Sequence, residues 1–270
     1  MAELPEITKL AGQMKDTLCG KTIQTVALLQ EKCANIPPDE FQKRTAGAKI
    51  TDIYHKGKWI ITTLDNSENI LLSLGMGADI LYFEHEENLP DKYQVKVNFT
   101  DGSGYTARFW WFGKFLLASN LASEPNTKDI AIDPFNERFT PEYFAELLKG
   151  KKTQVKAFLM NQKNIGGIGN MYMHDILFKA KLHPQKKISE ISADGIQCLY
   201  DSMLEVLSLS RSKGSFSYES DFFGQKGGFS TEDFLVGYKE NQPCPMCGEN
   251  IISIKTGSTS TFICPACQKI

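Results

Sequence analysis

The chain has 270 residues, of which 41% are hydrophobic and 23% charged, and its formal net charge is -2. This length suggests about two domains of ~100–200 residues each, and the composition is that of a globular protein with sizeable cores. The sequence has no run of about 18 apolar residues, which excludes a membrane span, and its start lacks the basic-then-apolar profile of a signal peptide. We therefore expect a cytoplasmic protein, or a nuclear one if the organism has a nucleus.

The first seven residues, MAELPEI, open an amphipathic helix that we expect over about residues 3 to 18. Met1 precedes a small residue and is normally removed, which would leave a free amine on Ala2 directly beside the Glu3 carboxylate. The ordinary interpretation is that Glu3 complements the positive end of the helix dipole. These seven residues alone do not distinguish that role from a chemical one.

Alternating apolar and polar residues then predict antiparallel strands joined by tight turns. The Asp101-Gly102 pair is a hairpin signal between two of them. We expect a β-sandwich that ends near Asn120, in a domain of residues 1–122. The strand-forming stretches are residues 21–29, 47–65, 69–83, 93–102 and 105–118.

Residues 123–139 are rich in Pro, Asn and Asp and predict a linker. Thr140 and Pro141 then form an N-cap and first helical position, and helical patterns continue to about Ser212. The glycine-rich segment 214–234 predicts a mobile loop. We expect a helical domain over residues 140–238 and a terminal module over 239–270.

The terminal module carries two Cys-x-x-Cys pairs separated by sixteen residues. Four thiolates at this spacing suit one structural zinc ion in a closed tetrahedral site, whereas a redox pair would need only one such motif. The predicted ligands are Cys244, Cys247, Cys264 and Cys267. The remaining cysteines, Cys19, Cys33 and Cys198, are scattered and are expected to be small thiols in a reducing compartment.

A lysine-rich stretch between residues 149 and 187 has Asp175 as its only acid, and is a candidate phosphate-binding face. Within it, Gly166, Gly167 and Gly169 form a tight turn before a helix that begins at Asn170. The bare amides of a helix N-terminus bind anions readily, and Lys156 and Lys163 flank the turn. The alternatives are a merely solvated pair of helices and a glycine corner that serves packing only.

Several motifs together resemble the formamidopyrimidine-DNA glycosylase/endonuclease VIII family over essentially the whole chain. They are MAELPEI, GKW at 57–59, LGMG at 74–77, FG at 112–113, QKNIGGIGNMY at 162–172 and the CPMCG…TGSTSTFICPACQ ending. The resemblance implies an α+β protein, with an N-terminal β-sandwich, a helix-two-turn-helix domain and a zinc finger. The GQKGGF segment at 224–229 resembles the lesion-capping loop of the formamidopyrimidine branch.

The resemblance also implies roles for single residues. The Ala2 amine would attack the sugar C1′ of a flipped nucleotide while Glu3 moves protons, and Lys58 would hold a phosphate next to the lesion. Lys156 and Asn170 match phosphate contacts of the helical domain. Met76 and Phe112 match two of the three side chains that fill the gap left by the flipped base.

Three functional positions depart from the family pattern. Ala2 replaces the usual N-terminal proline, Trp110 aligns with the arginine that pairs with the widowed base, and Thr259 aligns with the arginine of the zinc finger. An indole can stack or wedge but cannot read a base edge. Alternatively, the loop has moved and Trp110 simply packs. Lys255 in the same hairpin as Thr259 is the candidate to compensate for the lost arginine.

These features favour a monomeric DNA repair glycosylase that flips and excises a damaged base, with weak or absent AP lyase activity. Its partner would be double-stranded DNA with a damaged or abasic site. The alternative is a non-catalytic binder of damaged, abasic or distorted DNA. A zinc module used only for protein contacts is disfavoured, because Glu3, Lys58 and Asn170 occur together.

Overall fold

The computed structural model describes residues 2–270, the side chain of Asn88 excepted, and divides them into two compact units. One unit comprises the chain up to residue 129 together with residues 214–228, and the other comprises residues 130–213 and 229–270. The expected removal of Met1 concerns a residue outside the described ones. The expected limits 1–122, 140–238 and 239–270 stay predictions.

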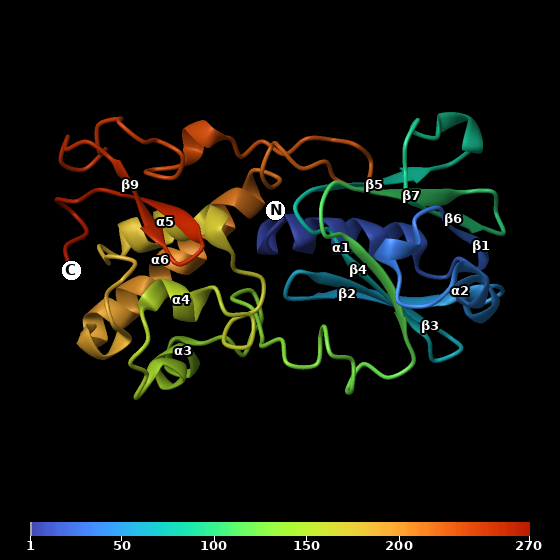
Figure 1. The fold of residues 1–270 in the computed structure, drawn as a ribbon, viewed down its shortest axis with the longest axis horizontal. Coiled ribbons are helices and arrows are strands. Elements are labelled where there is room, and N and C mark those ends of the chain that lie inside the picture. The colour runs from blue at the N-terminus through green and yellow to red at the C-terminus, as the bar shows by residue number, and fades with distance from the viewer. Residues whose placement is uncertain (1) are drawn as a thin grey trace. The chain divides into compact units, whose positions relative to one another are not determined.

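The first unit is a two-layer antiparallel sandwich (Figure 1). Its elements are α1 (Leu4–Leu18), β1 (Ile23–Leu28), η1 (Glu31–Cys33), α2 (Pro38–Thr45), β2 (Ile50–Lys56), β3 (Trp59–Leu64), β4 (Asn69–Ser73), β5 (Ala78–Phe83), η2 (Glu86–Asn88), β6 (Val95–Phe99), β7 (Gly104–Phe109) and β8 (Lys114–Ala118). The sheet orders are β1-β6-β7-β5 and β2-β3-β4-β8. The expected helix, strands and sandwich are therefore confirmed, and the hairpin at Asp101-Gly102 joins β6 to β7.

Two stretches that look continuous in the sequence cross from one sheet to the other. Residues 69–83 contain β4 of one sheet and β5 of the other, and residues 105–118 contain β7 and β8 in the same way. The crossings fall at residues 74–77 and 110–113. Helix α2, which the alternating pattern did not predict, is only eight residues long and buries mainly Phe41 against Phe115.

The core of the first unit is formed by both sheets and one face of α1. Ile7, Leu10 and Met14 recur at helical spacing on α1 and are at most 3% exposed. They join strand residues such as Ile53 and Val97 in one buried cluster. This packing fixes the start of α1, and hence residues 2 and 3, relative to the strands.

Segment 214–228 belongs to this first unit, because Phe222 is fully buried in its core against Tyr82 and Tyr105. The backbone N–H of Phe222 donates to Gln13 Oε1 at 3.0 Å, and its carbonyl accepts from the N–H of Tyr82 at 2.9 Å. Lys9 and Asp221 add an ion pair of 2.9 Å. These contacts tie the segment to the first unit, and the expected mobility of the glycine-rich loop stays a prediction.

The second unit is helical and ends in a β-hairpin. Its elements are α3 (Pro141–Leu148), α4 (Val155–Leu159), α5 (Asn170–Lys179), η3 (Ile188–Glu190), α6 (Ala193–Ser212), η4 (Thr231–Asp233), β9 (Ile252–Thr256) and β10 (Thr259–Ile263). Thr140 caps α3 by accepting from the N–H of Tyr143, and Pro141 occupies its first turn, as expected. The buried α5 packs against α6 and β10.

Asp175 of α5 holds the chain that leads to the terminal hairpin. Its side chain is 3% exposed and accepts hydrogen bonds from the N–H groups of Leu235 (2.6 Å), Val236 (3.0 Å) and Gly237 (3.0 Å). Asp175 therefore does not offset the positive charge of the lysine-rich stretch at the surface.

None of the helices within residues 2–270 is both long and apolar enough to cross a membrane.

Candidate nucleic-acid interface

Ala2 and Glu3 lie at the buried N-terminus of α1, each 2% exposed. The backbone N–H of Glu3 donates to Glu6 Oε2 at 2.9 Å, half of a capping box that satisfies an amide which the helix leaves unpaired. The second oxygen of Glu6 accepts from the N–H of Phe216 at 3.0 Å. Glu6 thereby ties the start of α1 to segment 214–228.

A cavity of about 260 Å³ lies within the first unit, where segment 214–228 meets the two crossings. It is lined by Gly77, Ala78, Asp79, Trp110, Ser217, Tyr218, Glu219 and Lys226. Glu219 is 8% exposed, and burial raises the pKa of its carboxyl group, which favours a form able to donate a hydrogen bond. Glu219 and Glu6 also line one smaller neighbouring cavity, so the larger cavity lies close to the start of α1.

Trp110 is half exposed and forms one wall of this cavity. Its ring meets that of Tyr218 edge-on at 6.2 Å, and the Arg108 guanidinium lies 5.5 Å from its centroid. The structure thus places Trp110 against the segment 214–228. Its role as a wedge in the base stack and the alternative that it only packs both stay predictions.

Met76 lies on one crossing and is 52% exposed. Trp111 and Phe112 lie on the other and are 66% and 76% exposed. The crossings are joined by hydrogen bonds from the N–H of Met76 to the carbonyl of Trp111 (2.8 Å) and from the N–H of Trp110 to the carbonyl of Gly77 (3.0 Å). Gly75 has a φ of 60°, and a Cβ there would lie 2.1 Å from the Trp111 carbonyl oxygen, so this close approach requires glycine. Large apolar side chains exposed to water on adjoining turns are typical of a binding surface and suit insertion into a base stack.

Lys58 lies in the first unit on the two-residue turn between β2 and β3, after Gly57 with its φ of 57°. Its side chain is partly exposed.

The second unit gathers the remaining predicted residues around the start of α5. Asn170 is the first residue of the helix, as the sequence predicted. The three glycines of the preceding turn are buried. The Nδ2 of Asn170 donates to the Ser260 carbonyl at 3.2 Å, and its Oδ1 accepts from the Thr259 hydroxyl at 3.2 Å. Lys163 and Lys255 are exposed.

Lys156 differs from the other lysines because only 4% of it is exposed. Its Nζ donates to the hydroxyls of Thr256 (2.8 Å), Thr259 (2.9 Å) and Thr261 (2.6 Å). Burial lowers the pKa of Lys156 to about 8. The structure thus brings Lys156, Asn170 and Thr259 together, and it places Lys156 beneath the surface.

Other lysines of the 149–187 stretch meet acids that lie outside it in the sequence. Lys179 pairs with Glu205 at 2.6 Å and Lys149 with Glu146 at 3.2 Å. These pairs are exposed and contribute little to stability. They reduce the excess positive charge that the sequence stretch alone suggested.

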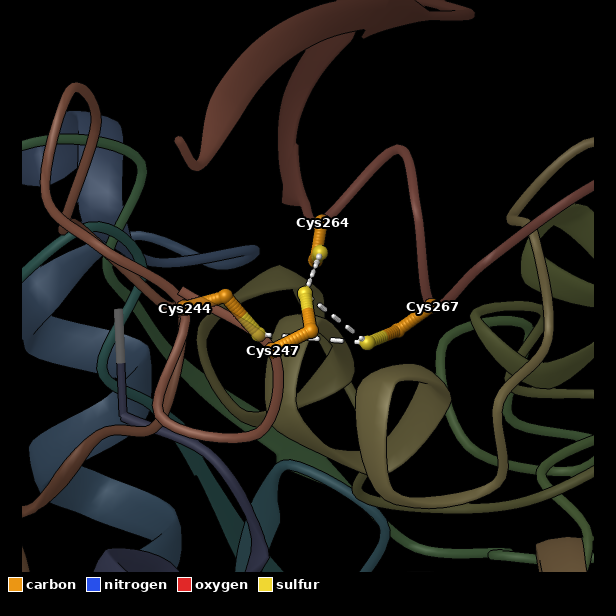
Figure 2. Close-up of side chains that lie close together, drawn as sticks. All are labelled: Cys244, Cys247, Cys264 and Cys267. Atoms are coloured by element: carbon orange, nitrogen blue, oxygen red, sulfur yellow. Dashed lines mark hydrogen bonds between the residues drawn. The ribbon is translucent and has the colours of Figure 1, made fainter. Parts of the chain in front are cut away.

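The four C-terminal cysteines form the zinc site that the sequence predicted (Figure 2). Their sulfur atoms all lie within 4.8 Å of one another, with Cys247 Sγ 3.4 Å from Cys264 Sγ and Cys244 Sγ 3.9 Å from Cys267 Sγ. Thiolates about 2.3 Å from a tetrahedral zinc ion lie about 3.8 Å apart, so the geometry fits the metal. All four ligand positions come from the protein, which makes the zinc structural.

Sequence reasoning missed the residues that hold segment 214–228 and the threonines around Lys156. Phe222, Gln13 and Asp221 carry no motif, since an aromatic or a polar residue in a glycine-rich stretch is ordinary. The alternation of Thr259 and Thr261 on one strand was a visible signal, because residues two apart on a strand share a face.

The fold defines a two-domain protein that joins a β-sandwich to a helical domain with a four-cysteine zinc finger. Three family models match: the formamidopyrimidine-DNA glycosylase N-terminal domain over residues 1–110, the H2TH domain of that glycosylase over 130–220, and the zinc finger found in FPG and IleRS over 241–270. The chain belongs to the formamidopyrimidine-DNA glycosylase family.

Similar proteins cover the whole chain. The formamidopyrimidine-DNA glycosylase of Brevibacillus brevis is 31% identical, over 100% of this chain and 99% of its own, and that of Mycoplasma genitalium is 30% identical, over 100% and 96%. Among solved structures, Lactococcus lactis Fpg in complex with DNA containing an abasic site has a TM-score of 0.88 at 25% identity, and each chain is covered fully. The same enzyme bound to DNA with N7-benzyl-Fapy-dG has a TM-score of 0.88 at 26% identity, over 99% of this chain and 100% of the other.

Proposed function

We propose that the protein excises a damaged base from double-stranded DNA through the amine of Ala2. The observation that carries the proposal is the buried Ala2-Glu3 pair at the start of α1, joined through Glu6 to the segment that closes the 260 Å³ cavity. A flipped base needs a pocket to enter and a nucleophile near the sugar to which it was attached. The family of the chain supports the same chemistry.

Ala2 and Glu3 each have one proposed role in the excision reaction. The neutral amine attacks C1′, the bond from C1′ to the base breaks, and the base leaves with a proton that Glu3 helps to deliver. An α-amine has a pKa of about 7.7–8.0, so a useful minority is neutral near pH 7. The amine nitrogen loses a proton after the attack, and the C1′–O4′ bond opens as O4′ takes one up, which leaves an imine between Ala2 and C1′. Water hydrolyses this imine, which restores the amine and leaves an abasic site.

Ala2 makes the strand-nicking step weaker than a proline would. A secondary amine always gives a cationic iminium, which withdraws electrons from C2′ and promotes β-elimination. The imine of a primary amine is neutral until it is protonated. We therefore propose efficient base release with slow AP lyase activity.

DNA binding is assigned to groups in both units. Met76 and Phe112 would fill the gap in the base stack, and Lys58 would hold a neighbouring phosphate. Asn170, Lys163 and Lys255 would contact phosphates further along, and steep salt dependence of the affinity is expected through counterion release. We propose that the protein acts as a monomer on DNA in the cytoplasm, or in the nucleus if the organism has one.

The substitutions at Ala2 and Thr259 favour one second candidate, a non-catalytic binder of abasic or distorted DNA. Such a binder would still use the exposed Met76 and Phe112 and the zinc finger, and it would not need a free amine. It does not explain why Glu3 is retained and buried beside Ala2.

The two candidates are separated by borohydride trapping on a duplex with an abasic site. The proposed enzyme gives a covalent protein–DNA adduct that maps to the N-terminal peptide, and acetylating the terminus or retaining Met1 abolishes it. Glu3→Gln should spare DNA binding and depress base release. Tight binding of the abasic duplex with no adduct, and with no base release from any lesion tested, would replace the enzyme with the binder.

A further inference from the structure

A groove of about 280 Å³ lies in the second unit between α3 and the first half of α6. Its lining includes Ala145 of α3 and, on α6, Ala193, Ile196 and Tyr200. Their spacing of three and four residues puts the α6 members on one face of that helix. The two alanines are exposed, and their small side chains leave open a space that a larger side chain on either helix would fill. The groove is therefore mainly apolar and open to solvent.

Tyr200 is held in a fixed position on one side of the groove. Its ring stacks on that of Phe139 at 6.0 Å and lies 5.9 Å from that of Phe144, and its hydroxyl donates to the Phe139 carbonyl at 2.9 Å. Burial raises the pKa of Tyr200, and the negative charges of Asp201 and Glu142 raise it further, so acids of both helices lie close to the groove. Because the ring cannot turn away without losing these contacts, the groove is formed before any ligand binds, which favours binding.

Acidic side chains border the groove on both helices. Glu142 belongs to its lining, and Asp194 and Asp201 each follow a lining residue on α6. None of these three carboxylates forms an ion pair within the described part of the chain. Glu146, one turn after Glu142 on α3, is by contrast paired with Lys149 at 3.2 Å. The border of the groove thus carries negative charge that the protein itself does not neutralise.

This charge excludes DNA as the ligand of the groove, because a negative border repels phosphate groups. The lining also shares no residue with Asn170, Lys163 and Lys255, to which DNA contacts are assigned. In Figure 1, α3 and β9 lie at opposite ends of the second unit, with α5 and α6 between them. The groove therefore lies away from the zinc-finger hairpin and can be occupied while DNA is bound.

We propose that the groove between α3 and α6 docks a basic amphipathic helix of a partner protein. Apolar side chains of that helix would fill the space beside Ala145 and Ala193, and its lysines or arginines would meet Glu142, Asp194 and Asp201. A helix suits the groove because its walls are two packed helices, and a third helix packs into such a groove by the same rules. Complementary charge selects this partner over a neutral or acidic one. The inference goes beyond the proposed function and does not depend on it.

The test uses the full-length protein and a synthetic, fluorescently labelled helical peptide as the probe. The peptide carries leucines at helical spacing on one face and lysines on the other, and a control peptide carries glutamates in place of the lysines. In about 0.1 M salt, fluorescence anisotropy should show saturable binding of the basic peptide with a Kd of about 100 μM or tighter. The acidic peptide should not bind.

Two pairs of variants locate the bound peptide. Ala145→Leu fills the groove with a side chain that a helix accepts well, and should weaken binding by roughly tenfold or more, because it displaces one buried leucine of the peptide. Ala157→Leu makes the same change at an exposed position of α4 outside the groove and should have no effect. Asp201→Asn should weaken binding about two- to fivefold, the effect of one exposed ion pair, whereas Glu232→Gln, at another exposed acid of the second unit, should not.

Zinc content, thermal unfolding and affinity for a duplex with an abasic site should stay close to those of the parent in Ala145→Leu and Asp201→Asn, because both positions are exposed. Where Ala145→Leu fails to fold, Asp201→Asn and its control decide. Loss of DNA affinity in a folded Ala145→Leu protein would assign the groove to DNA and overturn the inference.

Three further outcomes would overturn it. They are no saturable binding of the basic peptide at that affinity, equal binding of the acidic peptide, and equal effects of Ala145→Leu and Ala157→Leu. Self-association of the parent protein that Ala145→Leu abolishes would likewise assign the groove to a second copy of the chain. All of these results leave the proposed base excision untouched, and a parent protein that releases no base would leave the docking inference untouched.

Discussion

Replacing Phe222 with alanine should release segment 214–228 from the first unit. The ring is fully buried, 5.6 Å from the ring of Tyr82 and 6.1 Å from that of Tyr105. Removing a buried phenylalanine ring typically costs about 3–5 kcal/mol. The hydrogen bonds that Gln13 and Tyr82 make with the Phe222 backbone contribute only about 0.5–1.5 kcal/mol each, so they should not hold the segment alone.

Phe223→Ala is the matched control, because Phe223 is adjacent in the chain and 50% exposed. Its loss should cost less than about 1 kcal/mol. The assay combines denaturant unfolding with limited proteolysis between residues 214 and 228. Phe222→Ala should be cleaved rapidly there, while Phe223→Ala resists cleavage like the parent protein.

The same variant should affect function through the cavity. Ser217, Tyr218, Glu219 and Lys226 line it and all belong to the released segment. Phe222→Ala should therefore slow base release while zinc content and non-specific DNA binding stay unchanged. Equal proteolysis of the two variants, or normal base release by a Phe222→Ala protein whose segment is cleaved, would refute the reasoning.

Cys247→Ser should abolish the stoichiometric zinc found by elemental analysis and unfold the terminal hairpin, with loss of DNA affinity but an intact first unit; retention of one zinc per chain would contradict the ligand assignment. Lys21 lowers the pKa of Asp101 to about 2 from 3.8, so this carboxylate stabilises the folded state above about pH 4 and the effect is lost as the pH falls toward 2. Asp101→Asn should therefore make stability less sensitive to acid in that range, and an unchanged acid profile by circular dichroism would contradict it. Because Trp110 cannot read a base edge, base release should vary little among the four bases opposite a lesion; a strong preference for cytosine would mean that another side chain reads that base.

Much of the fold could be predicted from the sequence because the relevant patterns are local. The two Cys-x-x-Cys pairs place their own ligands, Thr140 and Pro141 mark a helix start by themselves, and Asp101-Gly102 defines a turn within four residues. The glycine turn before Asn170 is equally short-ranged. The family resemblance added roles for residues such as Ala2, Glu3 and Lys58, which the periodicity of apolar residues does not predict.

The tertiary structure decided what depends on residues far apart in the chain. Gln13 forms a hydrogen bond with Phe222 across 209 positions, which joins segment 214–228 to the first unit, and the Trp110 ring contacts Tyr218 of that segment. Lys156 meets Thr256 across 100 positions, which buried a lysine that its neighbours in the sequence suggested was at the surface. Local sequence determines which backbone conformations are favourable, but burial and the pairing of charges are set by whichever distant segments pack together, and only the folded chain specifies those.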